Sequence, residues 1–101
     1  MGVSVREVAN GRRFEIYEDD ELAGFAEVVP QGDAMALPHT EVVLARGGRG
    51  LASELIRVTL ETLRDRGQTV LPYCPFVSSY IAKHPEFLPI VPPDARSQFG
   101  L

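Results

Sequence analysis

Four side chains of this chain are of types that could move a proton or attack a carbonyl carbon. His39 and Glu41 are two residues apart, so in an extended strand they point to the same face. Together they could accept a proton from an amine. Cys74 precedes Pro75, which holds it extended and places the thiol at the start of a helix, where the dipole favours a nucleophilic thiolate. Tyr80, six residues later, could donate a proton to a leaving thiolate.

Each of these residues also has a purely structural interpretation. Cys74 could fill space at the end of a buried strand as a small apolar residue, which its position alone favours. Tyr80 could pair with Phe76, four residues earlier on the same helix, as a half-buried aromatic. His39 and Glu41 could form a surface pair, and two potential ligands are too few to predict a metal site. Spacing leaves these alternatives open, and we expect no metal.

A glycine-rich segment, Arg46–Gly50, precedes a stretch with helical spacing. The first amides of a helix have no internal partner and lie at the positive end of its dipole. No Ser, Asp or Asn stands immediately before Leu51 to cap them, and Arg49 adds positive charge. Since glycines let a ligand approach closely, one interpretation is a phosphate or pyrophosphate on the amides of Arg46–Ala52. A flexible turn with a solvated arginine is the equally compatible alternative.

The elements that must position these residues follow from hydrophobic periodicity and turn signals. We expect strands at residues 3–8, 12–18, 22–29, 34–43 and 69–72, and helices at residues 51–66 and 76–83. Pro38 predicts a bulge or an edge position in the fourth strand, and three prolines predict an irregular tail, Pro89–Leu101. In the third strand we expect one face to carry Leu22, Gly24, Ala26 and Val28.

The order β-β-β-β-α-β-α predicts an α+β fold with a mixed sheet, in a single domain covering residues 1–101. The strands before and after the first helix are expected to be parallel and adjacent. The chain is 45% apolar and 24% charged, as in an ordinary globular protein, and its net charge of −4 argues against binding to nucleic acid or an anionic membrane. A single cysteine excludes an internal disulfide. With no signal peptide and no long apolar stretch, we expect a cytoplasmic location.

Three segments, in this order, resemble the small stand-alone branch of the GNAT acetyltransferase superfamily. They are His39–Val42, Gly48–Ser53 and Cys74–Phe87. In the last one, Cys-Pro-Phe-Val is followed by Tyr-Ile and by Lys-His-Pro-Glu, a pattern quite specific to this branch. The resemblance extends from Phe14 to Phe87, nearly the whole chain.

The resemblance implies a short form of the acyl-CoA N-acyltransferase fold, in which the fourth and fifth strands are splayed apart. Acetyl-CoA would lie in the splay, with its pantetheine arm along the fourth strand and its pyrophosphate on the glycine-rich turn. Cys74 would face the thioester and Tyr80 would be the general acid. The superfamily prefers Gln or Arg where Gly47 stands, so Arg46 or Arg49 would supplement the amides at the rim. The residues expected to contact the cofactor are Val42, Val43, Leu44, Arg46, Gly47, Gly48, Arg49, Gly50, Leu51, Ala52, Ser53 and Cys74.

The implied activity is transfer of acetyl from acetyl-CoA to an amine, either a small molecule or a protein lysine. His39 or Glu41, directly or through water, would take the proton. Direct attack by the amine is the superfamily's usual route, and an acetylated Cys74 is the alternative. The N-terminal helices that usually build the amine site are absent, so a partner or a homodimer could complete it. A CoA-binding sensor or an interaction module with little catalysis is the second hypothesis.

Overall fold

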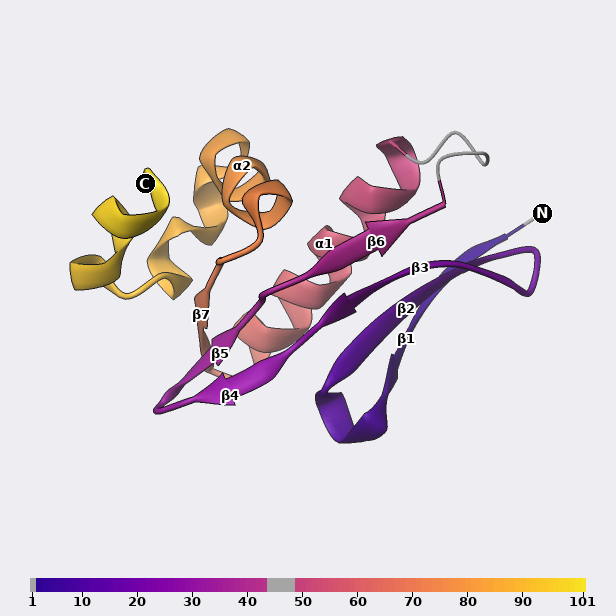
Figure 1. Cartoon of the computed structure of the whole chain (residues 1–101), viewed down its shortest axis with the longest axis horizontal. Helices are drawn as coiled ribbons and strands as arrows, with labels where there is room; N and C mark the ends of the chain where they lie inside the picture. The colour runs from indigo at the N-terminus through magenta and orange to yellow at the C-terminus, as the bar shows by residue number, and fades with distance from the viewer. Residues whose placement is uncertain (1, 44–48) are drawn as a thin grey trace.

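The structure is a computed structural model that describes residues 2–43 and 49–101. Its N-terminal half is an antiparallel sheet with the strand order β1-β2-β3-β6 (Figure 1). These strands are β1 (Val3–Val8), β2 (Arg13–Glu18), β3 (Glu21–Glu27) and β6 (Thr40–Val42). The predicted meander of three strands is therefore confirmed.

The third strand departs from the predicted face pattern. Leu22 and Gly24 pair with consecutive residues of β2, so Ala23 is an extra residue on β3. This bulge shifts the alternation, so Ala23 is fully buried whereas Leu22 is 45% exposed. The prediction that Leu22 shares one face with Gly24, Ala26 and Val28 is wrong for Leu22, because the bulge separates it from the other three.

The predicted fourth strand is split into two. Its first part, β5 (Ala34–Ala36), belongs to a second sheet with β4 (Val29–Gln31) and β7 (Thr69–Leu71), in the order β4-β5-β7. Its second part is β6, and the register shifts by one residue between the two parts. The bulge predicted at Pro38 is thus confirmed.

The split separates β6 from β7. β7 runs parallel to β5, whereas β6 pairs with β3 (Figure 1). The prediction of parallel, adjacent strands around the first helix holds for β5 but is wrong for β6. This divergence is the splay that the resemblance implied.

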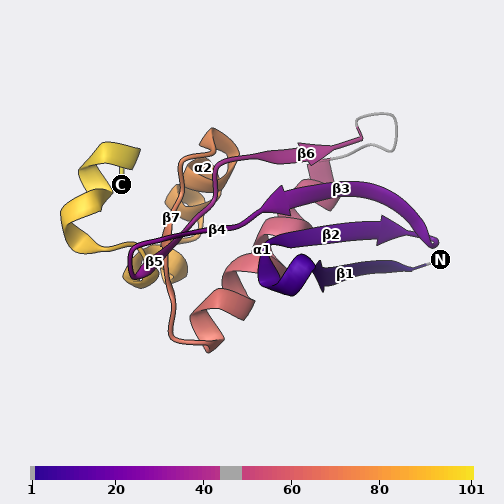
Figure 2. The same ribbon diagram turned by 60° about the horizontal axis from the view of Figure 1, so that its bottom comes forward.

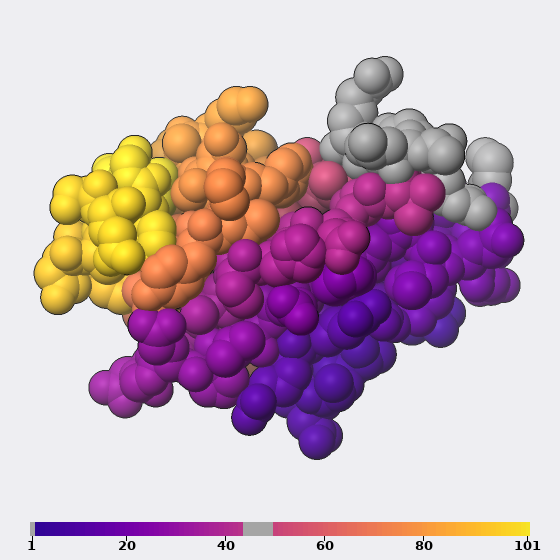
Figure 3. All heavy atoms as spheres, in the orientation of Figure 1, coloured from indigo at the N-terminus to yellow at the C-terminus, as the bar shows by residue number. Residues whose placement is uncertain are grey.

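Helix α1 (Arg49–Asp65) lies across one face of the first sheet, here called the inner face (Figure 2). Its apolar stripe, with Leu55, Ile56 and Leu60, is fully buried against the strands. On the opposite, outer face of the sheet, none of the described residues forms a helix that covers the strands (Figure 3).

The C-terminal part contains α2 (Pro75–Lys83) and two 3-10 helices, Pro85–Ile90 and Pro93–Phe99. Ile90 and Val91 are buried in the same core as α1, and Phe99 packs against that core. The predicted irregular tail therefore consists largely of 3-10 turns, because its apolar residues anchor it to the core.

Candidate functional site

His39 and Glu41 meet on the outer face of β6. Nε2 of His39 lies 3.0 Å from Oε2 of Glu41, and the two side chains are 51% and 63% exposed. The ring of Phe25 is 5.9 Å from the imidazole, centroid to centroid. A carboxylate on one ring nitrogen orients an imidazole and leaves the other nitrogen to bind or exchange a proton. The pair thus has the geometry of a proton acceptor open to solvent.

The backbone of β6 has one edge in the sheet and one edge free of any described strand. The amide of Glu27 donates to the carbonyl of His39 at 2.9 Å, and the amide of Val43 donates to the carbonyl of Ala23 at 2.7 Å. Residues 39, 41 and 43 therefore direct their backbone groups toward β3. By the alternation of an antiparallel ladder, Thr40 and Val42 direct theirs to the other edge.

This edge bears directly on the predicted cofactor contacts at Val42, Val43 and Leu44. A ligand that carries amide groups could add to the edge as an extra strand, bonding to Thr40 and Val42. The amide of Val43 is already used within the sheet, and Leu44 lies outside the described residues. The backbone geometry therefore favours Val42, together with Thr40, which sequence reasoning missed.

The hydroxyl of Thr40 supports the same edge as a binding position. Its Oγ1 is buried and has no hydrogen-bond partner among the described residues. A buried polar group without a partner costs about 1–3 kcal/mol. A polar ligand group on the inner side of β6 would satisfy it.

Cys74 lies at the start of α2, as predicted. It is the N-cap residue, with φ −68° and ψ 125°, and it is 7% exposed. Its amide donates to the carbonyl of Leu37 at 2.8 Å, while the amide of Leu37 donates to the carbonyl of Leu71. Since Leu37 is two residues before His39, these bonds hold Cys74 beside the bend where β5 leads into β6. The thiol therefore sits where the splay begins.

Tyr80 is buried between the two helices. It is 7% exposed, and its ring stacks on His84 with centroids 3.9 Å apart. Nδ1 of His84 donates to the carbonyl of Tyr80 at 2.8 Å. Burial raises the pKa of Tyr80, and the positive charge of Arg57 on α1 reduces this rise. The phenol is thus protonated at neutral pH, as a proton donor must be.

The structure therefore groups the predicted catalytic residues in two places. His39 and Glu41 lie on the outer face of β6, whereas Tyr80 lies between α1 and α2. Cys74 stands at the junction of these regions.

Most of the glycine-rich turn, residues 44–48, lies outside the described residues, and with it the predicted contacts of Leu44, Arg46, Gly47 and Gly48. Helix α1 begins at Arg49, two residues before the predicted start, so Gly50 lies within the first turn. A Cβ on Gly50 would meet nothing within 4 Å. Packing therefore does not require glycine here, although glycine costs about 1 kcal/mol relative to alanine inside a helix.

The helix start has the features expected of an anion site. Its first turn contains no acidic residue, and its first amides, such as those of Gly50 and Leu51, have no partner within the helix. The side chains of Leu51 and Ala52 are buried, whereas Ser53 is exposed. Of the predicted contacts at this end, the backbone of Gly50 is the most open to a ligand.

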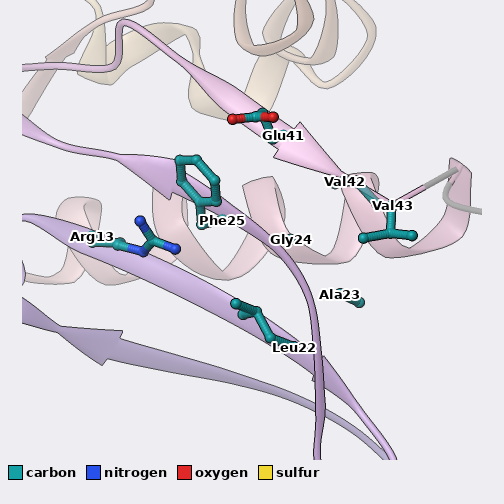
Figure 4. A pocket seen from close by; sticks show the side chains of 8 residues that line it. All are labelled: Arg13, Leu22, Ala23, Gly24, Phe25, Glu41, Val42 and Val43. Carbon is teal, nitrogen blue, oxygen red and sulfur yellow. The ribbon is translucent and has the colours of Figure 1, made fainter.

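A hollow on the outer face was not predicted. It has a volume of about 280 Å³ and lies beside β6, on the side of the sheet away from α1 (Figure 4). The sequence pattern that could have indicated this hollow is the alternation of β2, which places Arg13, Glu15 and Tyr17 on one face of the sheet. Sequence reasoning did not connect that polar face with Phe25 of the next strand. The residues that line the hollow are Arg13, Leu22, Ala23, Gly24, Phe25, Glu41, Val42 and Val43.

Among residues 2–43 and 49–101, no group of three or more His, Cys, Asp or Glu side chains could hold a metal ion. No helix there is both long and apolar enough to cross a membrane.

The chain also matches a known protein family. A family model described as GCN5-related N-acetyl-transferase matches residues 13–90. The match runs from β2 to the end of the 3-10 helix Pro85–Ile90, and it contains His39, Glu41, Cys74 and Tyr80. The antiparallel sheet, the mixed sheet, the separation of β6 from β7 and the two helices are compatible with that family's fold. The chain therefore belongs to the GCN5-related N-acetyltransferase family.

Proposed function

We propose that this protein is an N-acetyltransferase that moves the acetyl group of acetyl-CoA to an amine. One observation carries the proposal: β6 has a free backbone edge on one side and the His39–Glu41 pair on its outer face. A single strand can thus bring a thioester and an amine together.

The residues present fit acetyl-CoA. Thr40 and Val42 would bond the amides of the pantetheine arm, and the buried hydroxyl of Thr40 would gain a partner. The pyrophosphate would lie at the start of α1, where Gly50 leaves space for it. Contacts from Leu44, Arg46, Gly47, Gly48 and Arg49 remain predictions.

The chemistry requires proton transfers on both sides of β6. The bound thioester supplies an activated acetyl carbonyl. His39, oriented by Glu41, takes a proton from the ammonium form of the acceptor. The neutral nitrogen then forms the new C–N bond as the C–S bond breaks, and the nitrogen loses its second proton to water. Tyr80, which is protonated at neutral pH, returns a proton to the departing thiolate.

The alternative route is an acetylated Cys74. Here the thiolate would form a thioester first, and the amine would attack it in a second step. Cys74→Ala should abolish turnover if this route operates, measured as acetyl-CoA consumption. Near-normal turnover by that variant, with an unchanged melting temperature, would leave direct attack.

Binding of acetyl-CoA is the first test. At a concentration 100 times its Kd, the cofactor should stabilise the protein by about 2.7 kcal/mol. For a domain of this size, that corresponds to a rise in Tm of roughly 10–20 °C. No shift with millimolar CoA or acetyl-CoA would favour an interaction domain and reject the proposal.

The second candidate is a CoA-binding sensor, which the uncovered outer face favours. An enzyme and a sensor both predict the thermal shift. They differ in whether acetyl-CoA is consumed when small amines, polyamines and lysine peptides are added. Binding without turnover for every amine, alone and at concentrations that would form a homodimer, would support the sensor.

A further inference from the structure

A series of side-chain contacts crosses the outer face and fixes Arg13 at the hollow. The hydroxyl of Tyr17 donates to Oε1 of Glu15 at 2.6 Å, and Nε of Arg13 donates to Oε2 at 2.8 Å. The side chain of Glu15 is only 14% exposed. Because both of its oxygens are occupied, Glu15 acts as a fixed support that orients the guanidinium.

Arg13 still has most of its donors available. Its Cζ lies 3.8 Å from the centre of the Phe25 ring, so the guanidinium stacks on that ring. Only Nε is hydrogen-bonded to a described residue, and Nη1 and Nη2 are not. Glu27 is opposite Arg13 in the strand register but forms no ion pair with it. The two terminal nitrogens are a planar fork that suits a carboxylate.

On the other side of Phe25, the neighbouring charged group is a carboxylate instead of a guanidinium. Glu41 is directly opposite Phe25 in the β3–β6 register and is bonded to His39. Figure 4 shows Phe25 between Arg13 and Glu41. Arg13 is on β2 and Glu41 on β6, two strand spacings apart across the sheet and two residues apart along it, or about 12 Å at the backbone. A molecule lying across Phe25 would meet a guanidinium at one end and a carboxylate–imidazole pair at the other.

The remaining wall of the hollow is apolar. Leu22 and Val43 are 45% and 46% exposed, although side chains of this size are usually buried. They offer an apolar surface to the stem of a ligand between its two charged ends.

We propose that the hollow binds the acetyl acceptor, and that the acceptor is a small amino acid whose amine and carboxylate are separated by a short aliphatic stem. The amine end would lie at His39 and Glu41, and the carboxylate would take the free nitrogens of Arg13. The positive charge of Arg13 disfavours a diamine. This inference rests on the proposed acetyltransferase function, because it assigns the acceptor of the same site.

The test uses three amines with stems of similar length that differ at the far end: 4-aminobutyrate, butylamine and putrescine. For the wild-type protein, kcat/KM for acetyl transfer should be about tenfold or more higher for 4-aminobutyrate than for butylamine, as expected for a charge-assisted bidentate contact. Putrescine should be the poorest. Arg13→Gln should bring the 4-aminobutyrate to butylamine ratio to about one, because the variant lacks the fork that distinguishes a carboxylate from a methyl group.

Arg12→Gln is the matched control, since it removes the same charge from the neighbouring residue, which does not line the hollow. It should keep the wild-type ratio. Arg13→Lys keeps the charge but loses the fork, so its ratio should fall between those of the wild type and Arg13→Gln. Melting temperatures show whether each variant is folded.

A binding measurement separates this inference from the proposed function. In the CoA-bound protein, 4-aminobutyrate should shift the NMR signals of Phe25, Glu41 and Val43 in the wild type and in Arg12→Gln, but not in Arg13→Gln. A ratio near one in the wild type, a preference kept by Arg13→Gln, or no shifts at these residues would overturn the assignment. If acetyl-CoA is still consumed with another amine, the acetyltransferase function would stand without it. Failure to bind acetyl-CoA would instead reject the function itself.

Discussion

Replacing Gly50 with alanine should make the free protein more stable and the cofactor bind more weakly. The added methyl group meets nothing within 4 Å, so it causes no clash in the free protein. Alanine favours a helix over glycine by up to about 1 kcal/mol, so the free energy of unfolding should rise by that amount. For a domain of this size, Tm should rise by about 4–8 °C.

The same methyl group would keep a phosphate away from the first amides of α1. A hydrogen bond to a charged group contributes about 1.5–3 kcal/mol, so losing one should raise the Kd for acetyl-CoA by about 10- to 150-fold. Thermal denaturation of the free protein and calorimetric titration with acetyl-CoA measure the two effects. Ser79→Ala, on the exposed side of α2, is the control, because it favours helix without approaching α1. If Gly50→Ala gains stability and keeps its Kd within about twofold, the assignment of this turn to the pyrophosphate is refuted.

Three further predictions concern packing, proton transfer and pH. Gly24→Ala places a Cβ in a clash with the carbonyl oxygen of Glu41, so it should push β6 away from β3. We expect the free energy of unfolding, measured by chemical denaturation, to fall by about 1–3 kcal/mol, and acetyl-CoA to bind more weakly. Unchanged stability would contradict the close approach of the two strands. Tyr80→Phe should lower kcat about a hundredfold or more without changing the thermal shift by acetyl-CoA, and an unchanged kcat would exclude Tyr80 as the acid. A hydrogen bond from Arg66 lowers the pKa of Glu7, so the stability it contributes is present above pH 4.5 and is lost as the pH falls below it. Glu7→Gln should therefore lower the free energy of unfolding at pH 7 by less than about 1 kcal/mol, and its dependence on pH should be flatter than that of the wild type below pH 4.5. A variant curve parallel to the wild-type curve would show that Glu7 does not contribute to the acid dependence.

The sequence determined the features that depend on local rules. A proline fixes the backbone of the residue before it, so Cys74-Pro75 marked the start of α2 without any knowledge of the fold. The two-residue period of a strand placed His39 and Glu41 on one face. The proline within the predicted fourth strand marked the bulge, because proline cannot donate a ladder hydrogen bond.

The tertiary structure decided what depends on which strands pair. The division of the predicted fourth strand between two sheets leaves one edge of β6 free, and no local signal specifies the partner of each half. The bulge in β3 exposes Leu22, because register is set by packing across the sheet rather than by the strand itself. Arg13 reaches Phe25 only because β2 and β3 are neighbours in that register. Local geometry thus supplied the candidate proton acceptor and thiol, whereas long-range pairing supplied the edge and the hollow on which the cofactor and acceptor assignments rest.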